Sequence, residues 1–367
     1  MSNSGAKATA FREMLRPGPP PADPAAIDWD KLGFVPVDTA FVAGSVAQAD
    51  GSFEALEVLP WGELALPPSA TVLNYGQALF EGLKARRGAD GKVRLFRVAD
   101  NAARMRSGAE RFMLAQPSIE LFRAAVEAVV KANLAYVPPY GRGALYVRPI
   151  LAGVGRTLAP LPSPRTLFMV YVNPVGHYFK GLSCIAIKAT DEHHRAAEKG
   201  VGRVKAAGNY APCFKPVIEA KAGGYADLLF LDHDGTRIEE VGSANLCAVK
   251  KGALLVADSP SILQGITRDS VKRIAADKLG LRVEFGPLAL DRVLGLGEWK
   301  SEGRAEELFC TGTAAIVSPI GRLTWRGTDY EFSGGQPGKA TSAIYAELDG
   351  IQTGALPDPY GWTSVVA

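Results

Sequence analysis

The order of hydrophobic and polar residues predicts a strand-rich segment near the start of the chain. Residues from about Phe34 to Leu95 have the pattern of strands, with turns at Ala49-Asp50-Gly51 and at 87–91. After a helical interval, strands are predicted again at Leu145–Val154 and Thr166–Val172.

The helical interval contains two predicted helices. The first lies near Asp100–Met113, and the second begins at the N-cap candidate Ser118 and ends at about Tyr136, before two prolines. Apolar residues of the second helix recur at a spacing of three or four positions, which predicts one buried face. The residues of this face are Phe122, Val126, Val129 or Val130, and Leu134.

The second half of the chain is also rich in predicted strands. Asp227–Asp232 is apolar and β-prone, and His233-Asp234-Gly235 after it is a hairpin signal. The next strand is expected to run from Ile238 through Val241 and on to Val249. Lys250-Lys251-Gly252 then turns the chain into a last strand at Ala253–Val256.

We therefore expect an α+β protein with two domains. Helices of the second domain are predicted at about Ala211–Ala222, Asp269–Leu279 and Ala340–Asp349. The expected divisions are a flexible N-terminal arm at 1–27, a small domain at 28–174, a linker loop at 175–181 and a larger domain at 182–367.

Length and composition allow two domains with real cores, because the chain has 367 residues, of which 47% are hydrophobic. The formal net charge is +3 and the basic residues are interspersed with acidic ones, so we expect no nucleic-acid partner. No apolar run approaches the ~18 residues of a membrane span. We expect a soluble, intracellular protein of the cytoplasm, or of a plastid or mitochondrion if a targeting segment was removed from its start.

The cysteines and histidines show no pattern of metal ligands. His193 and His194 are adjacent and therefore face apart, which favours a solvated loop over a metal site. The four cysteines are Cys184, Cys213, Cys247 and Cys310. They are far apart in sequence and are typical of reduced, buried residues in an intracellular protein.

The most specific chemistry is expected at Lys205, which lies in the glycine-rich run Gly200–Pro212 with Tyr210 close behind it. Most lysines are solvated surface charges. A lysine held against a bound aldehyde can instead form a Schiff base, which needs a desolvated amine with a lowered pKa.

Glu239 and Glu240 offer a carboxylate to accompany this lysine. Neighbouring side chains on a strand face opposite ways, so one can be solvated while the other points inward beside small residues. A buried carboxylate is costly unless it meets a cation or a proton donor, and a protonated pyridine nitrogen would be such a partner. Two surface glutamates on a strand edge are the simpler alternative.

Two segments are candidates for binding a phosphate-sized anion. Thr267 is a good N-cap and Gly280 a good C′ residue for the helix between them, and the N–H groups at a helix start attract anions. The run Gly334–Thr341 resembles a phosphate-binding P-loop, but its glycines are too close together and alanine follows its lysine, so we expect a turn there.

These segments occur together in a known family. The chain resembles the branched-chain-amino-acid aminotransferases, pyridoxal-phosphate enzymes of fold type IV, from about Asp28 to its end, and its pattern is closest to plant and algal members. The segments that carry the resemblance are Leu73–Lys84, Arg94–Arg97, Ala103–Met105, Leu145–Pro149, the Lys205 run, Glu240–Asn245, Gly265–Arg268, Thr311–Ala314, Gly350–Gly354 and Gly361-Trp362. The resemblance implies a smaller N-terminal α/β domain and a larger strand-rich domain, with pyridoxal 5′-phosphate at their interface.

The resemblance implies roles around this cofactor. Lys205 would form the internal aldimine and later move a proton, Glu240 would pair with the pyridine nitrogen, and Tyr210 would hydrogen-bond the phenolic oxygen. Arg104 would bind the phosphate; other arginines lie near it in sequence, and only the resemblance selects it. The remaining cofactor contacts implied are Ser243, Leu263, Ile266, Thr267 and Thr313.

The resemblance also implies a substrate pocket. The turn at Thr313 and Ala314 would hold the α-carboxylate through backbone N–H groups, and Arg148 would receive the γ-carboxylate of glutamate. The aromatic wall suited to aliphatic side chains would consist of Tyr75, Phe80, Tyr146 and Tyr178. Without the resemblance, such aromatic residues are more often part of a core than of a pocket.

Two positions depart from the family pattern. Mammalian members carry a redox-sensitive C-x-x-C after the Thr-Ala turn, whereas this chain has Ala315–Ser318 there, so we predict no thiol switch. Asn74 stands where relatives often have histidine, and the sequence assigns no consequence to that change.

The activity implied is reversible transfer of the amino group of L-leucine, L-isoleucine or L-valine to 2-oxoglutarate, by a ping-pong route through pyridoxamine phosphate. A D-amino-acid transaminase or an aminodeoxychorismate lyase would share the fold but lack the blocks Tyr75–Gly82 and Gly361-Trp362. Activity on methionine-derived 2-oxo acids stays open. A non-catalytic binding protein would need a broken lysine or acid position, and both are intact. The family also implies a homodimer with small-molecule substrates.

Overall fold

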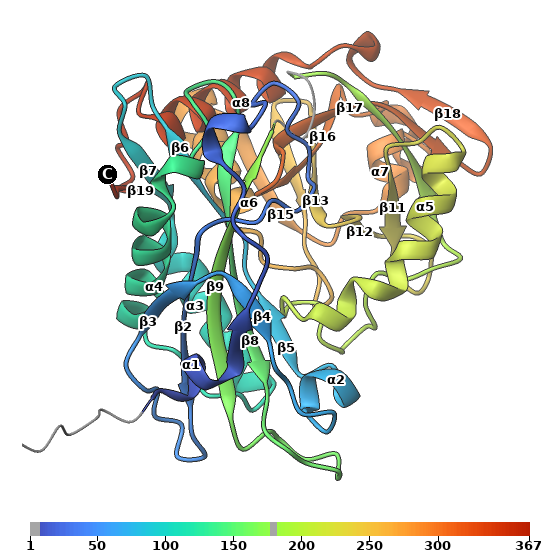
Figure 1. Ribbon diagram of the computed structural model, residues 1–367. Coiled ribbons are helices and arrows are strands. Elements are labelled where there is room, and N and C mark those ends of the chain that lie inside the picture. The colour runs from blue at the N-terminus through green and yellow to red at the C-terminus, as the bar shows by residue number, and fades with distance from the viewer. Residues whose placement is uncertain (1–7, 177–181) are drawn as a thin grey trace, which may run out of the picture. The chain divides into compact units, whose positions relative to one another are not determined.

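The computed structural model describes residues 8–176 and 182–367, and its chain forms two compact units (Figure 1). The first unit contains the chain up to Gly176 together with Asp358–Ala367, and the second ends at Pro357. Tyr178, predicted to contribute to the substrate pocket, lies outside the described residues. None of the helices in the described ranges has the length and apolarity needed to cross a membrane.

The first unit is built on an eight-stranded sheet whose pairings are all antiparallel. In order across the sheet its strands are β19 (Thr363–Val365), β7 (Val93–Phe96), β6 (Leu83–Arg87), β8 (Ala144–Gly153), β9 (Thr166–Val175), β2 (Phe41–Ala47) and β3 (Glu57–Pro60), and β5 (Ala78–Phe80) also pairs with β8. A separate pair consists of β1 (Leu15–Pro17) and β4 (Gly62–Leu64). The predicted strands at 145–154 and 166–172 are confirmed as β8 and β9, although β9 continues to Val175, inside the predicted linker.

Two longer helices of this unit confirm the predicted helical interval. They are α3 (Val98–Arg111) and α4 (Ile119–Ala132), and Ser118 caps α4 by accepting a hydrogen bond from Leu121 N at 3.0 Å. The predicted apolar face of α4 is buried as far as Val130. The helix ends earlier than predicted, because the side chain of Asn133 is engaged with the start of β2: its Oδ1 accepts from Ala40 N and Phe41 N.

Two short helices complete the first unit, α1 (Ala10–Met14) and α2 (Thr71–Tyr75). Helix α2 falls inside the segment that was predicted as strands, so that prediction is wrong there. It ends where Gly76 takes a left-handed conformation, with φ of 63°, which glycine adopts at little cost.

The second unit contains a nine-stranded sheet. In order its strands are β12 (Ile238–Val241), β11 (Asp227–Leu231), β10 (Ile185–Thr190), β17 (Ile316–Trp325), β16 (Glu307–Gly312), β13 (Ala244–Lys250), β14 (Ala253–Ala257) and β15 (Arg282–Gly286), and β18 (Thr328–Glu331) pairs with β17. Because β12 also pairs with β13, the strands from β12 to β13 close into a ring. The core cluster of this unit is made mainly of aliphatic residues from these strands.

The prediction of one continuous strand from Ile238 to Val249 is wrong. The chain turns back at Gly242-Ser243, so β12 and β13 form a tight antiparallel hairpin with Glu240 opposite Asn245. Gly242 has φ of 52°, and a Cβ there would lie 2.4 Å from a carboxylate oxygen of Asp227, so only glycine fits this turn. The hairpin determines which groups face Glu240.

The helices of the second unit are α5 (Phe214–Ala222), α6 (Ile266–Leu279), α7 (Leu290–Leu294) and α8 (Lys339–Thr353). Gly280 ends α6 in a left-handed conformation, as predicted. The predicted N-cap Thr267 is wrong, because the helix already begins at Ile266 and Gly265 occupies the cap position. Thr267 instead lies in the first turn and is buried.

The run Gly334–Thr341, which resembles a P-loop, contains the predicted turn and then the start of α8. The first N–H groups of α8 are already occupied: Ala340 N and Thr341 N donate to the carboxylate of Glu307 at 2.9 and 2.8 Å. A Cβ on Gly338 would lie 2.1 Å from that carboxyl carbon. A side chain of the protein therefore fills the place where an anion would bind.

The last residues of the chain correct the predicted extent of the second domain. Strand β19 pairs with β7, the ring of Trp362 lies 5.8 Å from that of Phe96, and Val93 N donates to Ala367 O. Asp358–Ala367 therefore belong to the first unit, and the prediction of one domain over 182–367 is wrong for them.

Candidate functional site

Lys205 lies in a loop of the second unit that is stabilised by its own neighbours. Asn209 Nδ2 donates to the carbonyls of Val201 and Val204 at 2.9 and 3.1 Å, which folds the loop back on itself just before a 3₁₀ turn ends at Tyr210. Lys205 Nζ then lies 3.0 Å from Tyr210 Oη, within hydrogen-bond distance. The structure thus brings together the predicted amine and the predicted phenol.

Glu240 is a buried carboxylate with a dense set of partners. It is 2% exposed, forms an ion pair with Arg195 and accepts a hydrogen bond from Asn245 Nδ2 at 2.8 Å. Burial raises the pKa of Glu240 to about 7, and the charges of Arg195 and Lys205 oppose this rise. Because the Lys205 ammonium acts on this carboxylate, the amine and the acid belong to one electrostatic site.

Glu239 corrects the expectation that one of the two adjacent glutamates is solvated. It faces away from Glu240, as predicted, but is also buried, with 4% of its surface exposed. Its carboxylate accepts a hydrogen bond from Ser261 Oγ, and burial raises its pKa. Its partner Ser261 is distant in sequence and could not be predicted from the strand alone.

The start of α6 is held against the same group that holds Glu240. Asn245 Nδ2 also donates to Leu263 O at 3.0 Å, and a Cβ on Gly265 would lie 1.9 Å from Asn245 Oδ1. Only glycine at 265 lets the helix start come this close. The predicted contacts Leu263, Ile266 and Thr267 therefore lie next to the predicted acid, with the positive end of the helix dipole.

Two turns of the second unit lie side by side. Ser243 is in the turn between β12 and β13, and Thr313 and Ala314 are in the turn between β16 and β17. Strands β13 and β16 pair with Asn245 opposite Thr311, and an added Cβ on Gly312 would lie 3.8 Å from Ser243 O. The structure thus places the three predicted turn residues near one another and near Asn245.

In the first unit, an arginine and two aromatic neighbours form a second cluster. The guanidinium of Arg148 lies 4.6 Å from the ring centre of Phe80 and 5.1 Å from that of Tyr146, and it donates to Tyr146 Oη at 3.1 Å. A Cβ on Gly82 would lie 2.1 Å from that hydroxyl. Three of the predicted pocket residues therefore come together on β5 and β8, and a fourth, Tyr75, does not join them.

Tyr75 lies on α2 and is 47% exposed, and its hydroxyl donates to Leu158 O. Within the described part of this chain, its contact is thus to a surface loop and not to the cluster of Arg148.

Arg104 on α3 makes a two-pronged ion pair that was not predicted. Its Nε and Nη2 donate to the carboxylate oxygens of Glu81 at 2.8 and 2.6 Å, and the Glu81 side chain is fully buried. Glu81 lies between the apolar residues of the block that carries the resemblance. An acid in such a position is the one sequence signal that could have identified this partner.

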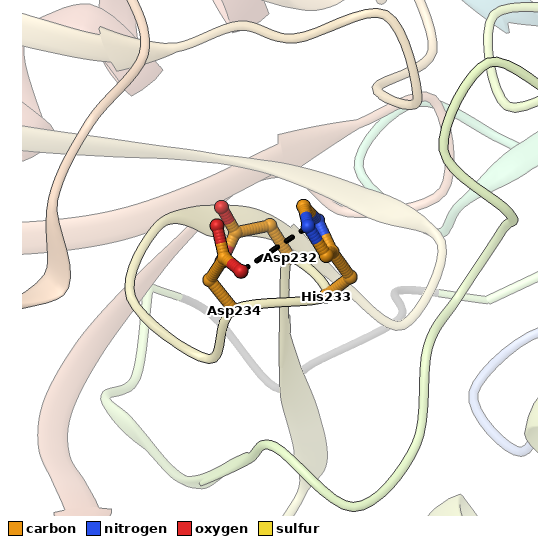
Figure 2. Close-up of side chains that lie close together, drawn as sticks. All are labelled: Asp232, His233 and Asp234. Atoms are coloured by element: carbon orange, nitrogen blue, oxygen red, sulfur yellow. Dashed lines mark ion pairs between the residues drawn. The ribbon is translucent and has the colours of Figure 1, made fainter.

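A third cluster, Asp232, His233 and Asp234, lies at the turn between β11 and β12, and Figure 2 shows His233 directed toward Asp234. His233 pairs with Asp234 and with Glu198, both at 3.1 Å. Asp232 Oδ1 accepts from Thr236 N and Arg237 N at 3.0 and 2.9 Å. These interactions confirm the predicted hairpin turn.

Comparison with known proteins connects these clusters. The family model for class IV amino-transferases matches residues 78–323. A chloroplastic branched-chain amino acid aminotransferase of Humulus lupulus is 42% identical over 342 residues, which cover 92% of this chain and 81% of the relative. A methionine aminotransferase of Arabidopsis thaliana is 38% identical, with 92% of this chain and 93% of the relative covered.

A solved structure of the Escherichia coli branched-chain amino acid aminotransferase superposes with a TM-score of 0.73. It is 25% identical in sequence, and the match covers 90% of this chain and 100% of that one. A related bacterial-type branched-chain amino acid aminotransferase, solved with pyridoxamine 5′-phosphate, superposes with a TM-score of 0.74 at 26% identity. The likeness therefore extends over both units and includes every cluster described above.

Proposed function

This chain belongs to the class IV aminotransferases, and we propose that Lys205, Tyr210 and Glu240 carry its chemistry. Its reaction is the reversible transfer of the amino group between L-leucine, L-isoleucine or L-valine and 2-oxoglutarate, with pyridoxal 5′-phosphate as cofactor. The observation that carries the site assignment is the Lys205–Tyr210 contact of 3.0 Å beside a buried carboxylate.

The residues of the second unit fit this cofactor. Its aldehyde needs a primary amine, its pyridine nitrogen needs a buried acid, and its phosphate needs N–H donors; Lys205, Glu240 and the start of α6 offer these groups within one unit. When bound, the cofactor supplies an electron sink for the carbanion that forms when the substrate loses its Cα proton.

Lys205 moves the proton. Its Nζ takes the proton from the substrate's Cα and returns it on the other side of the reaction, which requires a neutral amine at working pH. The Tyr210 hydroxyl, 3.0 Å away, holds the amine in place through a hydrogen bond. Glu240 supplies the negative charge that keeps a proton on the pyridine nitrogen, so that the ring can accept electrons.

The other predicted residues bind and orient. We propose that Arg104, Ile266 and Thr267 hold the phosphate, with Glu81 fixing the fork of Arg104. The remaining assignments are cofactor contacts at Ser243, Leu263 and Thr313, α-carboxylate contacts at Thr313 and Ala314, and side-chain contacts at Tyr75, Phe80, Tyr146, Arg148 and Tyr178. The cation–π contacts of Arg148 leave it a guanidinium for the γ-carboxylate of glutamate within an aromatic wall that suits leucine.

Borohydride reduction of the cofactor-loaded protein tests the lysine assignment. The pyridoxyl mass should be found on the peptide that contains Lys205, and Lys205→Ala should abolish turnover while the fold is retained. Lys215→Ala is the matched control, because the side chain of Lys215 is 84% exposed in the same unit, and it should leave turnover unchanged. A label on any other lysine refutes the assignment.

Methionine is a second candidate substrate, because one relative with 38% identity is a methionine aminotransferase. We propose that the aliphatic branched-chain substrates are preferred. The test is a comparison of kcat/KM for L-leucine, L-methionine and D-alanine with 2-oxoglutarate. A preference for methionine would replace the substrate class, and a preference for D-alanine would overturn the stereochemistry.

We also propose that the protein is a homodimer, in which a second copy covers the apolar surface around α2. Leu73, Tyr75 and Leu158 are 60%, 47% and 90% exposed in the single chain, and the last two are joined by a hydrogen bond. Light scattering should give twice the chain mass, and Leu158→Glu should shift it toward the monomer. A monomeric parent protein contradicts the proposal.

Relatives of this chain are named as chloroplastic or mitochondrial proteins. For this chain we propose the cytoplasm or one of these organelles. Localisation of a fluorescent fusion of the full-length chain distinguishes the compartments.

A further inference from the structure

Arg195 is a buried arginine that joins three segments of the second unit. Its side chain is 5% exposed and forms the ion pair with Glu240. Its Nη2 also donates to Gly202 O at 3.0 Å and to Ser261 O. One side chain thus connects the strand that carries the acid, the segment that leads to Lys205, and the loop that precedes α6.

The two carbonyls that accept from Arg195 lie against each other. A Cβ on Gly202 would lie 2.1 Å from Ser261 O, so the segment before Lys205 is in backbone contact with the loop before α6. On the other side, Asn245 Nδ2 holds Glu240 Oε1 at 2.8 Å and Leu263 O at 3.0 Å. The carboxylate of Glu240 is therefore held from two directions, by a charged donor and by a neutral one.

Three cations act on Glu240: Arg195, Lys205 and Arg268. Arg195 opposes the effect of burial on its pKa most strongly. Lys205 cannot serve as a permanent counter-charge, because its amine must be neutral when it takes a proton. Arg268 is occupied by Ala257 O and Gln264 Oε1, at 3.0 and 2.7 Å. Arg195 also acts on Glu239, whose carboxylate meets Ser261 from the opposite face of β12.

We propose that Arg195 is a positioning residue of the transamination site, which acts through Glu240 by keeping the shared proton on the pyridine nitrogen. This rests on the proposed role of Glu240. A carboxylate and a pyridine nitrogen share one proton, and the pair is either an ion pair or two neutral groups. A fixed guanidinium on the far side of the carboxylate stabilises the ion pair, whereas an uncharged residue there favours the neutral arrangement.

The test is the position of that proton, read from the ¹⁵N chemical shift of ring-labelled cofactor bound to Arg195→Gln, Arg195→Lys and the control Arg203→Gln. Arg203 is suitable because its side chain is 50% exposed and pairs with Asp258 on the surface. We expect the signal of a neutral pyridine in Arg195→Gln only, with kcat lowered at least about tenfold, the factor of one pKa unit. A protonated pyridine in folded Arg195→Gln overturns the inference.

The Glu240→Gln variant separates this inference from the proposed function. If Glu240→Gln keeps a protonated pyridine and full kcat, the proposed role of Glu240 fails. If Glu240→Gln loses the protonated signal and Arg195→Gln keeps it, only the inference about Arg195 fails.

A double variant keeps the inference testable even where Arg195→Gln does not fold alone. In the Glu240→Gln background, adding Arg195→Gln should change neither the ¹⁵N shift nor kcat, because the residue through which Arg195 acts is already neutral. A further tenfold loss of kcat in the double variant would show an independent role and overturn the inference.

Discussion

Replacing Glu240 by glutamine should change how the stability of the cofactor-free protein depends on pH. Burial raises the pKa of this carboxyl from 4.5 to about 7. The folded protein therefore binds the proton more tightly than the unfolded chain does. The stability that this group contributes is complete below pH about 4.5 and is lost as the pH rises toward about 7. Glutamine does not titrate, so the variant lacks this loss.

The size of the effect follows from the same pKa. A difference of about 2.5 between the folded and unfolded pKa corresponds to about 3 kcal/mol, since one pKa unit corresponds to about 1.4 kcal/mol. Most of it, about 2 to 3 kcal/mol, should fall between pH 5 and pH 8. The variant also loses the ion pair with Arg195, which lowers its stability, but the prediction concerns only the pH-dependent part.

The assay is urea unfolding of the cofactor-free protein at pH 5 and pH 8, followed by amide hydrogen exchange in peptides from β12 and β13. Other titrating groups affect the parent and the variant equally and cancel in the difference between them. Glu331→Gln on β18 is the control, because Glu331 is exposed in the same unit, and it should follow the parent. If Glu240→Gln loses as much stability as the parent between the two pH values, the carboxyl does not titrate in this window and the reasoning is refuted.

The remaining predictions concern three other groups. Glu307→Gln should lower the free energy of unfolding by about 1–2 kcal/mol in thermal melts, because α8 loses the anion at its start; an unchanged melting temperature would contradict the capping role. Gly265→Ala should weaken cofactor binding in an absorbance titration, because its Cβ would overlap Asn245, whereas Gly208→Ala, with no atom within 4 Å, should not; equal affinities would rule out this packing. Mild peroxide should leave the activity unchanged, because burial raises the pKa of Cys310 to about 12 and keeps the thiol protonated; a reversible loss traced to Cys310 would contradict this.

Local patterns predicted the elements whose signals lie within a few residues. Helix α4 was predicted because its cap Ser118 and its apolar face are both visible along the chain, and both are confirmed. The end of α6 was predicted because Gly280 is needed for a left-handed residue there. The helix α2 was missed because five residues are too few to establish a helical period among strands.

The hairpin at Gly242-Ser243 shows where such patterns fail. The residues on both sides are β-prone, so the sequence is compatible with one long strand as well as with two short ones. What selects the hairpin is the carboxylate of Asp227, which leaves no room for a Cβ on Gly242 and comes from a different strand. This contact is not visible in the local sequence.

The candidate site divides in the same way. The resemblance identified Lys205, Tyr210 and Glu240, and the structure places them in one unit with a direct Lys205–Tyr210 contact. Their supporting residues were not identified, because Glu81 and Arg195 reveal their roles only through ion pairs across 23 and 45 sequence positions. A charged residue that is buried by such a pairing looks in sequence like any surface charge.

The return of β19 to the first sheet has a consequence for biosynthesis. A ribosome completes residues 41–175, and thus all the other strands of that sheet, long before Thr363–Val365 emerge from its exit tunnel. Until translation terminates, the edge of β7 is uncovered and Phe96 lacks the indole of Trp362. Nascent chains stalled near their last codons should thus recruit chaperones, and a premature stop within the final ten codons should impair the part of the protein that was made first.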